Sequence, residues 1–220
     1  MPAEFARRMG SLLGEMRRNM DGVTAEAMYS AGVRGVLNYG VSIPAIRAIA
    51  RSAGKDHEFA KYLYRQQVRE LRMAAVSIAS SECVTADELP FWLGDNPTTE
   101  LLDELAMQLI SRTAPDVLDA VVGEWLERGD ARARYAAMMA LSRAHGYDMR
   151  RALAAVAAAV GEYPEDMRLA HGAVMLAVSV AAADVSLVPR IREMAAAFAA
   201  DVTPSPAGRH FAEETEWMIG

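Results

Sequence analysis

The sequence predicts an all-α protein, an α-α superhelix in which helical pairs stack as a single domain. Apolar residues recur at three- and four-residue spacing along the chain, and no segment alternates apolar and polar residues as a strand does. A charged residue followed by small residues also returns at a nearly constant interval, at Arg72, Asp103, Arg134 and Arg168, which are 31, 31 and 34 residues apart. Such recurring pairs are typical of an α-solenoid, because no pair can bury its apolar face alone. A compact helical bundle without repeats is the alternative.

The first 55 residues are predicted to form helices that cap the N-terminal end of the stack. Residues 3–20 place their apolar side chains on one side of a helix, and Thr24 is expected to cap a short second helix. A third helix is expected over 43–51. Its start is marked by Gly40, which can take a positive φ, and by Pro44, which needs no amide partner in a first turn.

Residues 56–183 are expected to form four helical pairs, and residues 184–220 a last pair that caps the C-terminal end. The predicted helices are 56–67 with 68–80, 85–93 with 98–112, 114–127 with 130–144, 148–160 with 165–183, and 185–200 with 206–218. The second helix of each of the four pairs carries the charged position. These second helices are therefore expected to line a common concave surface. The aromatic residues Phe211 and Trp217 are expected to cover the open end of the last repeat; the alternative is that they form an association surface.

The composition favours a folded soluble protein without a metal or cofactor. Apolar residues make up 52% of the chain and charged residues 24%. A single cysteine, Cys83, excludes an intrachain disulfide and a multi-cysteine metal site. No leader peptide or membrane-spanning run is present, so we expect a cytoplasmic location and no membrane partner. The preference for arginine over lysine, with abundant alanine, suggests a GC-rich bacterial source.

Charge is distributed unevenly along the chain. The net charge is −6, but residues 1–80 sum to +5 and the remaining residues to −11. A basic end on an acidic protein favours a local surface that faces phosphates. The alternative is a set of solvated helix faces without a ligand.

The recurring charged position is the remaining candidate for chemistry, because the common catalytic motifs of hydrolases, nucleotide-binding proteins and dehydrogenases are absent. Arginines along a shared surface can hold a phosphate backbone through bidentate contacts, which makes Arg72, Arg134 and Arg168 candidates for nucleic-acid binding. Asp103 is either a structural ion-pair partner or a reactive carboxylate that neighbouring arginines keep charged.

The segment Asn38-Tyr-Gly-Val-Ser-Ile-Pro-Ala-Ile-Arg-Ala-Ile-Ala50 resembles the aromatic-Gly-Val-x-x-Pro-x-[Leu/Ile]-Arg motif of the DNA alkylation repair family. Members of this family are alkylpurine DNA glycosylases built from HEAT-like repeats. The resemblance covers roughly residues 1–180. It implies a stack of HEAT-like repeats that holds duplex DNA in a basic cleft. It also implies that Asp103 stabilises charge near the sugar as a cationic base departs, and that Arg134 contacts the DNA backbone.

The sequence departs from the family at the positions that serve excision. Active members carry a tryptophan one helical turn before the aspartate, where this chain has Thr99. A second tryptophan and a following arginine align with Ala173 and Leu176, and an expected basic residue falls on Ser142, beside Arg143. Threonine and alanine cannot replace the packing surface of an indole ring. The scaffold thus resembles the family, whereas the residues that serve excision in active members are replaced in this chain.

Three functions follow from these observations. The first is a family member that binds DNA through its concave face, with weak or no base excision. Its predicted contacts are Arg72, Arg134, Arg143, Arg168 and the basic N-terminal helices. The alternative is a scaffold that holds a protein partner in the same groove without binding nucleic acid. The third is an active glycosylase that uses Asp103 together with a rearranged aromatic such as Tyr135 or Trp92.

Overall fold

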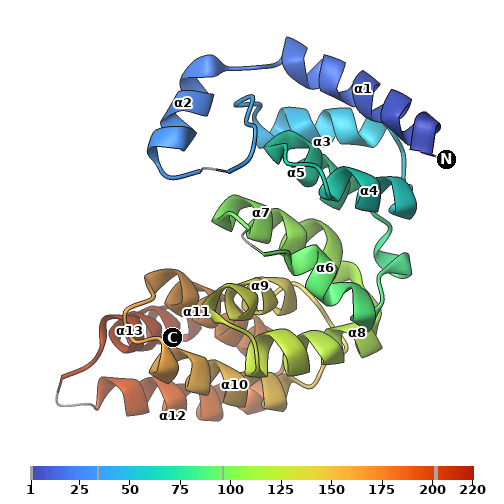
Figure 1. The fold of residues 1–220 in the computed structure, drawn as a ribbon. Coiled ribbons are helices and arrows are strands. Elements are labelled where there is room, and N and C mark those ends of the chain that lie inside the picture. The colour runs from blue at the N-terminus through green and yellow to red at the C-terminus, as the bar shows by residue number, and fades with distance from the viewer. Residues whose placement is uncertain (1, 34, 96, 201–202) are drawn as a thin grey trace. The chain divides into compact units, whose positions relative to one another are not determined.

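The computed structural model describes residues 2–33, 35–95, 97–200 and 203–220 (Figure 1). The described residues form helices and no strand, apart from one isolated bridge between Leu37 and Val68. The predicted all-α class is confirmed. The chain divides into two compact units, here called the first unit (residues 1–84 and 94–109) and the second unit (residues 85–93 and 110–220). The boundaries expected at residues 55 and 183 fall inside these units and stay predictions.

The first unit contains the N-terminal helices, one complete helical pair and most of the helix that carries Asp103. Its core is built from side chains that are fully or almost fully buried, among them Met16, Phe59, Leu71 and Leu102. Its elements are α1 (Pro2–Arg18), α2 (Gly22–Ser30), α3 (Ile43–Ser52), α4 (His57–Tyr64), α5 (Arg69–Ile78), η1 (Ser81–Cys83), α7 (Thr99–Glu104) and η3 (Leu105–Leu109). Helix α5 packs against α3, α4, α7 and η3, so it lies at the centre of this unit.

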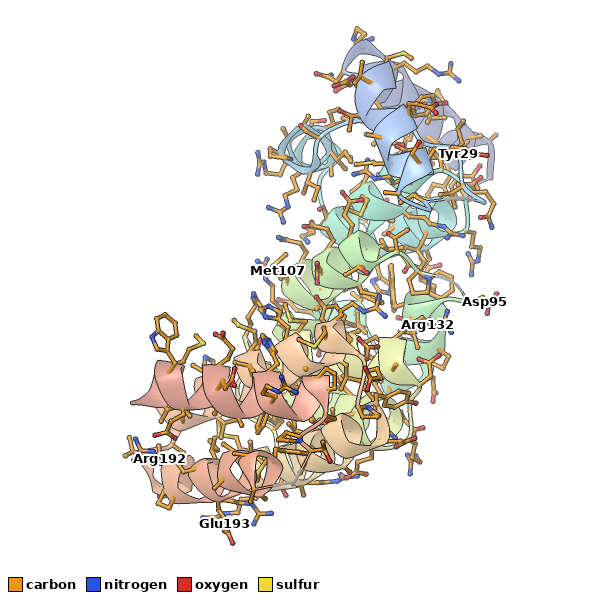
Figure 2. The ribbon with its side chains drawn as sticks, turned by 90° about the vertical axis from the view of Figure 1, so that its left-hand side faces the viewer. Tyr29, Asp95, Met107, Arg132, Arg192 and Glu193 are labelled. Atoms are coloured by element: carbon orange, nitrogen blue, oxygen red, sulfur yellow. The ribbon has the colours of Figure 1, made fainter. Side chains whose placement is uncertain are left out.

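Helix α2 differs from its predicted form. The expected cap at Thr24 is wrong: Asp21 caps the helix, and its carboxylate accepts hydrogen bonds from the amides of Val23 and Thr24 at 2.9 and 3.2 Å. The extended backbone of Asp21 places its carboxylate over these free amides, as is usual at a helix start. None of the described side chains of α2 is buried, and Tyr29 is 54% exposed (Figure 2).

The second unit contains the remaining helices. Its elements are η2 (Ala86–Glu88), α6 (Leu89–Leu93), η4 (Ile110–Arg112), α8 (Pro115–Ala120), η5 (Val121–Glu127), α9 (Ala131–Leu141), α10 (Met149–Glu162), α11 (Met167–Ala183), η6 (Val185–Leu187), α12 (Val188–Ala199) and α13 (Pro206–Ile219). Helix α11 packs against both α9 and α13, so second helices of successive pairs lie side by side here. Phe211 is fully buried against Phe198, whereas Trp217 is 79% exposed and does not cover the core. The capping role of the last pair stays a prediction.

Two segments that the sequence predicts as regular α-helices contain π-helical turns in the structure. The predicted helix 98–112 consists of α7, the π-helix η3 and the short 3₁₀-helix η4. The predicted helix 114–127 consists of α8 and the π-helix η5. π-turns are rare and often accompany functional positions, and η3 begins two residues after Asp103.

Candidate nucleic-acid interface

Asp103 lies half-buried on α7, between two carboxylates that anchor this helix. Glu100 accepts hydrogen bonds from Nε and Nη2 of Arg69, the first at 2.7 Å. Glu104, whose side chain is 2% exposed, accepts from Nε of Arg47 at 3.0 Å and also pairs with its Nη2. The hydrogen bond to Glu104 raises the pKa of Arg47. Two bidentate ion pairs thus fix the helix on which Asp103 is carried.

The segment that resembles the family motif is held by a buried acidic side chain. Oε1 of Glu70 accepts hydrogen bonds from the amides of Tyr39 and Val41, at 3.1 and 3.3 Å. The guanidinium of Arg69 donates to the carbonyl of Val41 at 3.0 Å and to Glu70 at 2.9 Å. Gly40, between the two amides, has a φ of +70°. Sequence reasoning missed Glu70, because its role depends on a loop thirty residues away.

Two arginines of the recurring position, Arg72 and Arg134, have the same structural role. Nε of Arg72 donates to the carbonyl of Gln66 at 3.0 Å, and Nε of Arg134 donates to the carbonyl of Gly129 at 2.8 Å. In both cases the carbonyl lies just beyond the first helix of the same pair, where backbone acceptors lack intrahelical partners. Positions 72 and 134 are therefore equivalent in their contacts as well as in their sequence spacing.

Arg134 is the most enclosed of the predicted DNA contacts. Its side chain is 8% exposed, forms an ion pair with Glu162 at 2.7 Å, and lies 5.3 Å from the ring centre of Tyr163. A second hydrogen bond joins its Nη2 to the carbonyl of Glu127. These contacts occupy much of the guanidinium, so little of it faces solvent.

Arg143 and Arg168 are more accessible. Arg143 is exposed and donates to the carbonyl of Met139 at 3.0 Å. Arg168 is 38% exposed, lies 3.8 Å from Asp166, and sits 5.6 Å from the ring centre of Tyr135.

The structure groups the four recurring positions by unit. Positions 72 and 103 lie on the packed helices α5 and α7 of the first unit, and positions 134 and 168 on the packed helices α9 and α11 of the second. Each unit thus holds two of the four positions on adjoining second helices. The nucleic-acid role of these residues stays a prediction.

None of the positions considered for an excision aromatic presents a ring to solvent. Thr99 begins α7, and Ala173 and Leu176 are fully buried in α11. The candidates for a rearranged aromatic, Trp92 and Tyr135, are 0% and 4% exposed. A buried ring cannot stack on an extruded base, so these residues do not restore the surface that the substitutions remove.

The exposed arginines of α1, here called its basic face, lie beside Glu4 and Glu15, which precede Arg7 and Arg18 by three residues. Arg7, Ser11, Gly14 and Arg18 follow one another at three- and four-residue spacing and so share one side of the helix. Arg7 and Arg18 are exposed and make no hydrogen bond or ion pair within the described residues. Arg17 is also exposed, with its guanidinium 5.7 Å from the ring centre of Tyr39. The charge asymmetry of the sequence is the signal that pointed to this end of the chain.

The described part of the chain lacks two other kinds of feature. No group of three or more His, Cys, Asp or Glu side chains there is placed to hold a metal ion. None of its helices is long and apolar enough to span a bilayer.

Comparisons with known proteins agree with this architecture. The profile of a family described as "DNA alkylation repair enzyme" matches residues 12–186. A solved structure, reported as "a new family of proteins related to the HEAT-like repeat DNA glycosylases with affinity for branched DNA structures", superposes with a TM-score of 0.68. The likeness covers 85% of this chain and 81% of that one at 17% identity, and it shows a shared HEAT-like repeat fold. No curated protein matches the sequence. Because the family profile spans most of its length, the chain belongs to the DNA alkylation repair family.

Proposed function

We propose that this protein binds DNA, with a preference for branched structures, and does not excise bases. The observation that carries the proposal is the basic face of α1, on a fold shared with a protein that is reported to have affinity for branched DNA. Arg72 in the first unit and Arg143 and Arg168 in the second unit are further predicted contacts, and Arg134 contributes least because it is enclosed.

The arginines fall into two groups: those that are engaged in ion pairs within the protein, and those that are available to a ligand. Arg47, Arg69 and Arg134 are engaged in ion pairs with Glu104, Glu100 and Glu162. Arg7 and Arg18 keep their guanidinium donors for a ligand. Because bidentate guanidinium contacts to phosphate are strong, exposed arginines on one helix face are suited to a DNA backbone. Contacts to the phosphate backbone position the protein on DNA and do not recognise the base sequence.

Base excision is not supported by the site. Asp103 is held on a well-anchored helix, so a carboxylate could still stabilise positive charge near a sugar. The residues at the two expected tryptophan positions, Thr99 and Ala173, provide no ring to pack against an altered base or its backbone. Holding the reacting groups in the correct orientation supplies a large part of catalysis. Without a surface that positions the nucleotide, a carboxylate lacks this contribution.

Fluorescence anisotropy with a labelled duplex and a labelled four-way junction tests the binding proposal. We expect a Kd tighter than about 10⁻⁵ M at low salt, weakening steeply as salt rises, because phosphate contacts release counterions. The junction is expected to bind more tightly than the duplex. Failure to bind either DNA at low salt would contradict the proposal and favour the protein-scaffold alternative.

Incubation with duplex containing 7-methylguanine tests the absence of excision. We expect the protein to release no base above the buffer control, measured as strand breaks after heating. The Asp103→Asn variant should be indistinguishable from the wild type in this assay. Release by the wild type that disappears in Asp103→Asn would show instead that the carboxylate is catalytic.

A further inference from the structure

Tyr39, the aromatic residue of the family motif, connects the buried centre of the first unit to the basic face of α1. Its amide donates to Oε1 of the fully buried Glu70 at 3.1 Å, and its carbonyl accepts from the amide of Asp21 at 3.0 Å. Both contacts use main-chain atoms of Tyr39, so they hold the residue in place independently of its side chain. The side chain is half-buried, and its hydroxyl reaches Arg17 at the end of α1.

Arg17 is exposed, yet two contacts with Tyr39 orient its side chain. Its Nη2 donates to the hydroxyl of Tyr39 at 3.4 Å, and its guanidinium carbon lies 5.7 Å from the centre of the Tyr39 ring. An arginine has five N–H donors, of which this hydrogen bond uses one. The hydroxyl oxygen acts as the acceptor, so its own hydrogen is left for a further acceptor. The pair therefore presents guanidinium and hydroxyl donors together at the surface.

We propose that Arg17 and the hydroxyl of Tyr39 together bind one phosphate of the DNA backbone. Arginine and tyrosine side chains are both usual donors to phosphate oxygens. A side chain that is already oriented loses less conformational freedom on binding, and an arginine has much of this freedom to lose. Tyr39 is thus both a contact and the residue that positions Arg17. The inference rests on the proposed DNA binding and assigns it a particular site.

Two carboxylates lie close to this pair in the sequence. Asp21 is occupied as the cap of α2, where it accepts hydrogen bonds from two amides and, at 2.8 Å, from the hydroxyl of Thr24. Glu15 precedes Arg17 by two residues, and side chains at that spacing do not face each other on a helix. Neither carboxylate forms an ion pair with Arg17 within the described residues. The charge of Arg17 is therefore not neutralised by either of them.

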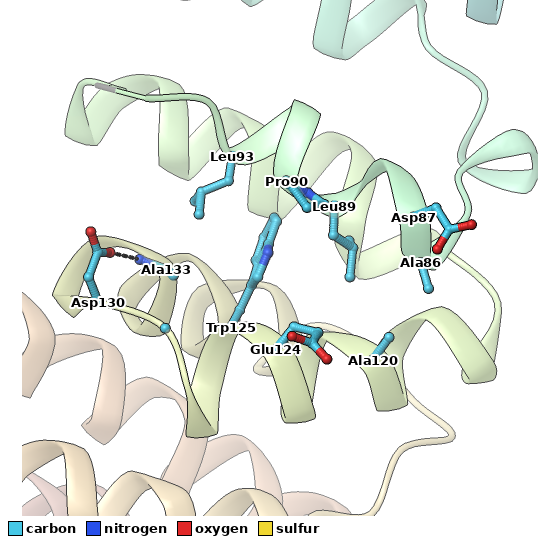
Figure 3. A pocket seen from close by; sticks show the side chains of 11 residues that line it. Ala86, Asp87, Leu89, Pro90, Leu93, Ala120, Glu124, Trp125, Asp130 and Ala133 are labelled. Atoms are coloured by element: carbon cyan, nitrogen blue, oxygen red, sulfur yellow. Dashed lines mark hydrogen bonds between the residues drawn. The ribbon is translucent and has the colours of Figure 1, made fainter.

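A groove in the second unit has the opposite character. Its volume is about 600 Å³, and Leu89 and Trp125 contribute apolar walls (Figure 3). Asp87, Glu124 and Asp130 also line it, and none of its described lining residues is basic. Because carboxylates repel a phosphate, this groove is not a second site of the same kind.

Removal of a single hydroxyl tests the inference, with binding measured by anisotropy of the labelled four-way junction. Tyr39→Phe keeps the ring and should bind the junction about three- to tenfold more weakly, because it loses one exposed hydrogen bond to a charged group. Its charge is unchanged, so the slope of log K against log salt should stay near the wild-type value. Arg17→Gln should also weaken binding and should lower that slope by about 0.9.

A matched control and a double variant separate this site from general effects. Tyr62→Phe removes a hydroxyl from α4 of the same unit, where the ring lies 5.6 Å from that of Phe5, and should bind as the wild type does. In Arg17→Gln/Tyr39→Phe, loss of the hydroxyl should cost less than about twofold beyond Arg17→Gln alone, because the two residues act on one phosphate. In Arg7→Gln/Tyr39→Phe, loss of the hydroxyl should cost as much as it does in the wild type.

The unfolding midpoint of Tyr39→Phe should stay close to that of the wild type, because the main-chain contacts to Glu70 and Asp21 are retained. The inference is overturned if Tyr39→Phe binds the junction as tightly as the wild type, or if Tyr62→Phe weakens binding equally. It is also overturned if Tyr39→Phe weakens binding as much in the Arg17→Gln background as in the wild type. Failure of the wild type to bind the junction would contradict the DNA-binding proposal itself, and this result is seen before any substitution is made.

Discussion

Replacement of Arg69 by methionine is expected to lower the free energy of unfolding by about 3–5 kcal/mol, because it leaves a buried carboxylate without its partner. Arg69 is 4% exposed and pairs with both Glu70 and Glu100, and Glu70 is fully buried. The variant also removes the hydrogen bond to the carbonyl of Val41. Urea unfolding followed by circular dichroism measures the loss.

A matched control separates burial from charge removal. Arg128→Met breaks the exposed pair with Glu124 and should change the unfolding free energy by about 0–1 kcal/mol. The double variant Arg69→Met/Glu70→Gln should recover part of the loss, because the uncompensated charge is then absent. Equal losses for Arg69→Met and Arg128→Met would contradict a buried ion-pair network.

Replacement of Gly40 by alanine is expected to cost about 2–5 kcal/mol, the sum of a left-handed backbone and a steric overlap. The φ of Gly40 is +70°, and a Cβ there would lie 2.1 Å from the carbonyl oxygen of Asp21 and 2.7 Å from the amide nitrogen of Ala25. Both are backbone atoms at the start of α2, so neither can turn aside as a side chain would.

Gly54 provides the control for this substitution. Its φ is +71°, and a Cβ there would meet no atom within 4 Å. Gly54→Ala should therefore cost only the backbone part, about 1–2 kcal/mol. The difference between the two variants in urea unfolding measures the close approach of the loop to α2. Equal losses of unfolding free energy for Gly40→Ala and Gly54→Ala would show that the close approach of the loop to α2 does not contribute to stability.

These substitutions bear on what the family motif means in this chain. Gly40 allows the loop to pass the start of α2, the amides of Tyr39 and Val41 are held by Glu70, and Arg47 anchors Glu104 beside Asp103. Each contact is structural. The motif therefore reports the family fold, and the chemistry of a particular member has to be decided from the residues around Asp103.

The sequence predicted the helices well because their signals are local. Apolar spacing and capping residues marked nearly every helix of the described chain to within a few residues, including α3, α9 and α13. The helix start expected at residue 56 and the break expected between residues 127 and 130 also depend only on neighbouring residues. The π-helices η3 and η5 were missed, because a wider turn is decided by packing and has no distinct residue pattern.

The candidate site was harder to predict from sequence. Spacing alone identified 72 and 134 as equivalent positions, but it could not show that their arginines bind carbonyls beyond the preceding helix. Whether an arginine is engaged or available depends on partners distant in the chain, such as Glu162 for Arg134. The exposed arginines of α1 were visible as a charge imbalance but not as a single helix face.

The salt dependence of DNA binding by an α1 variant tests the central claim most directly. In Arg7→Gln/Arg17→Gln/Arg18→Gln, we expect weaker junction binding and a slope of log K against log salt that is smaller by about 2–3, since each lost phosphate contact removes about 0.9. The control variant Arg190→Gln/Arg192→Gln/Arg209→Gln changes the net charge equally in the second unit and should retain the wild-type slope. Equal slopes for the two variants would contradict a DNA-binding face on α1.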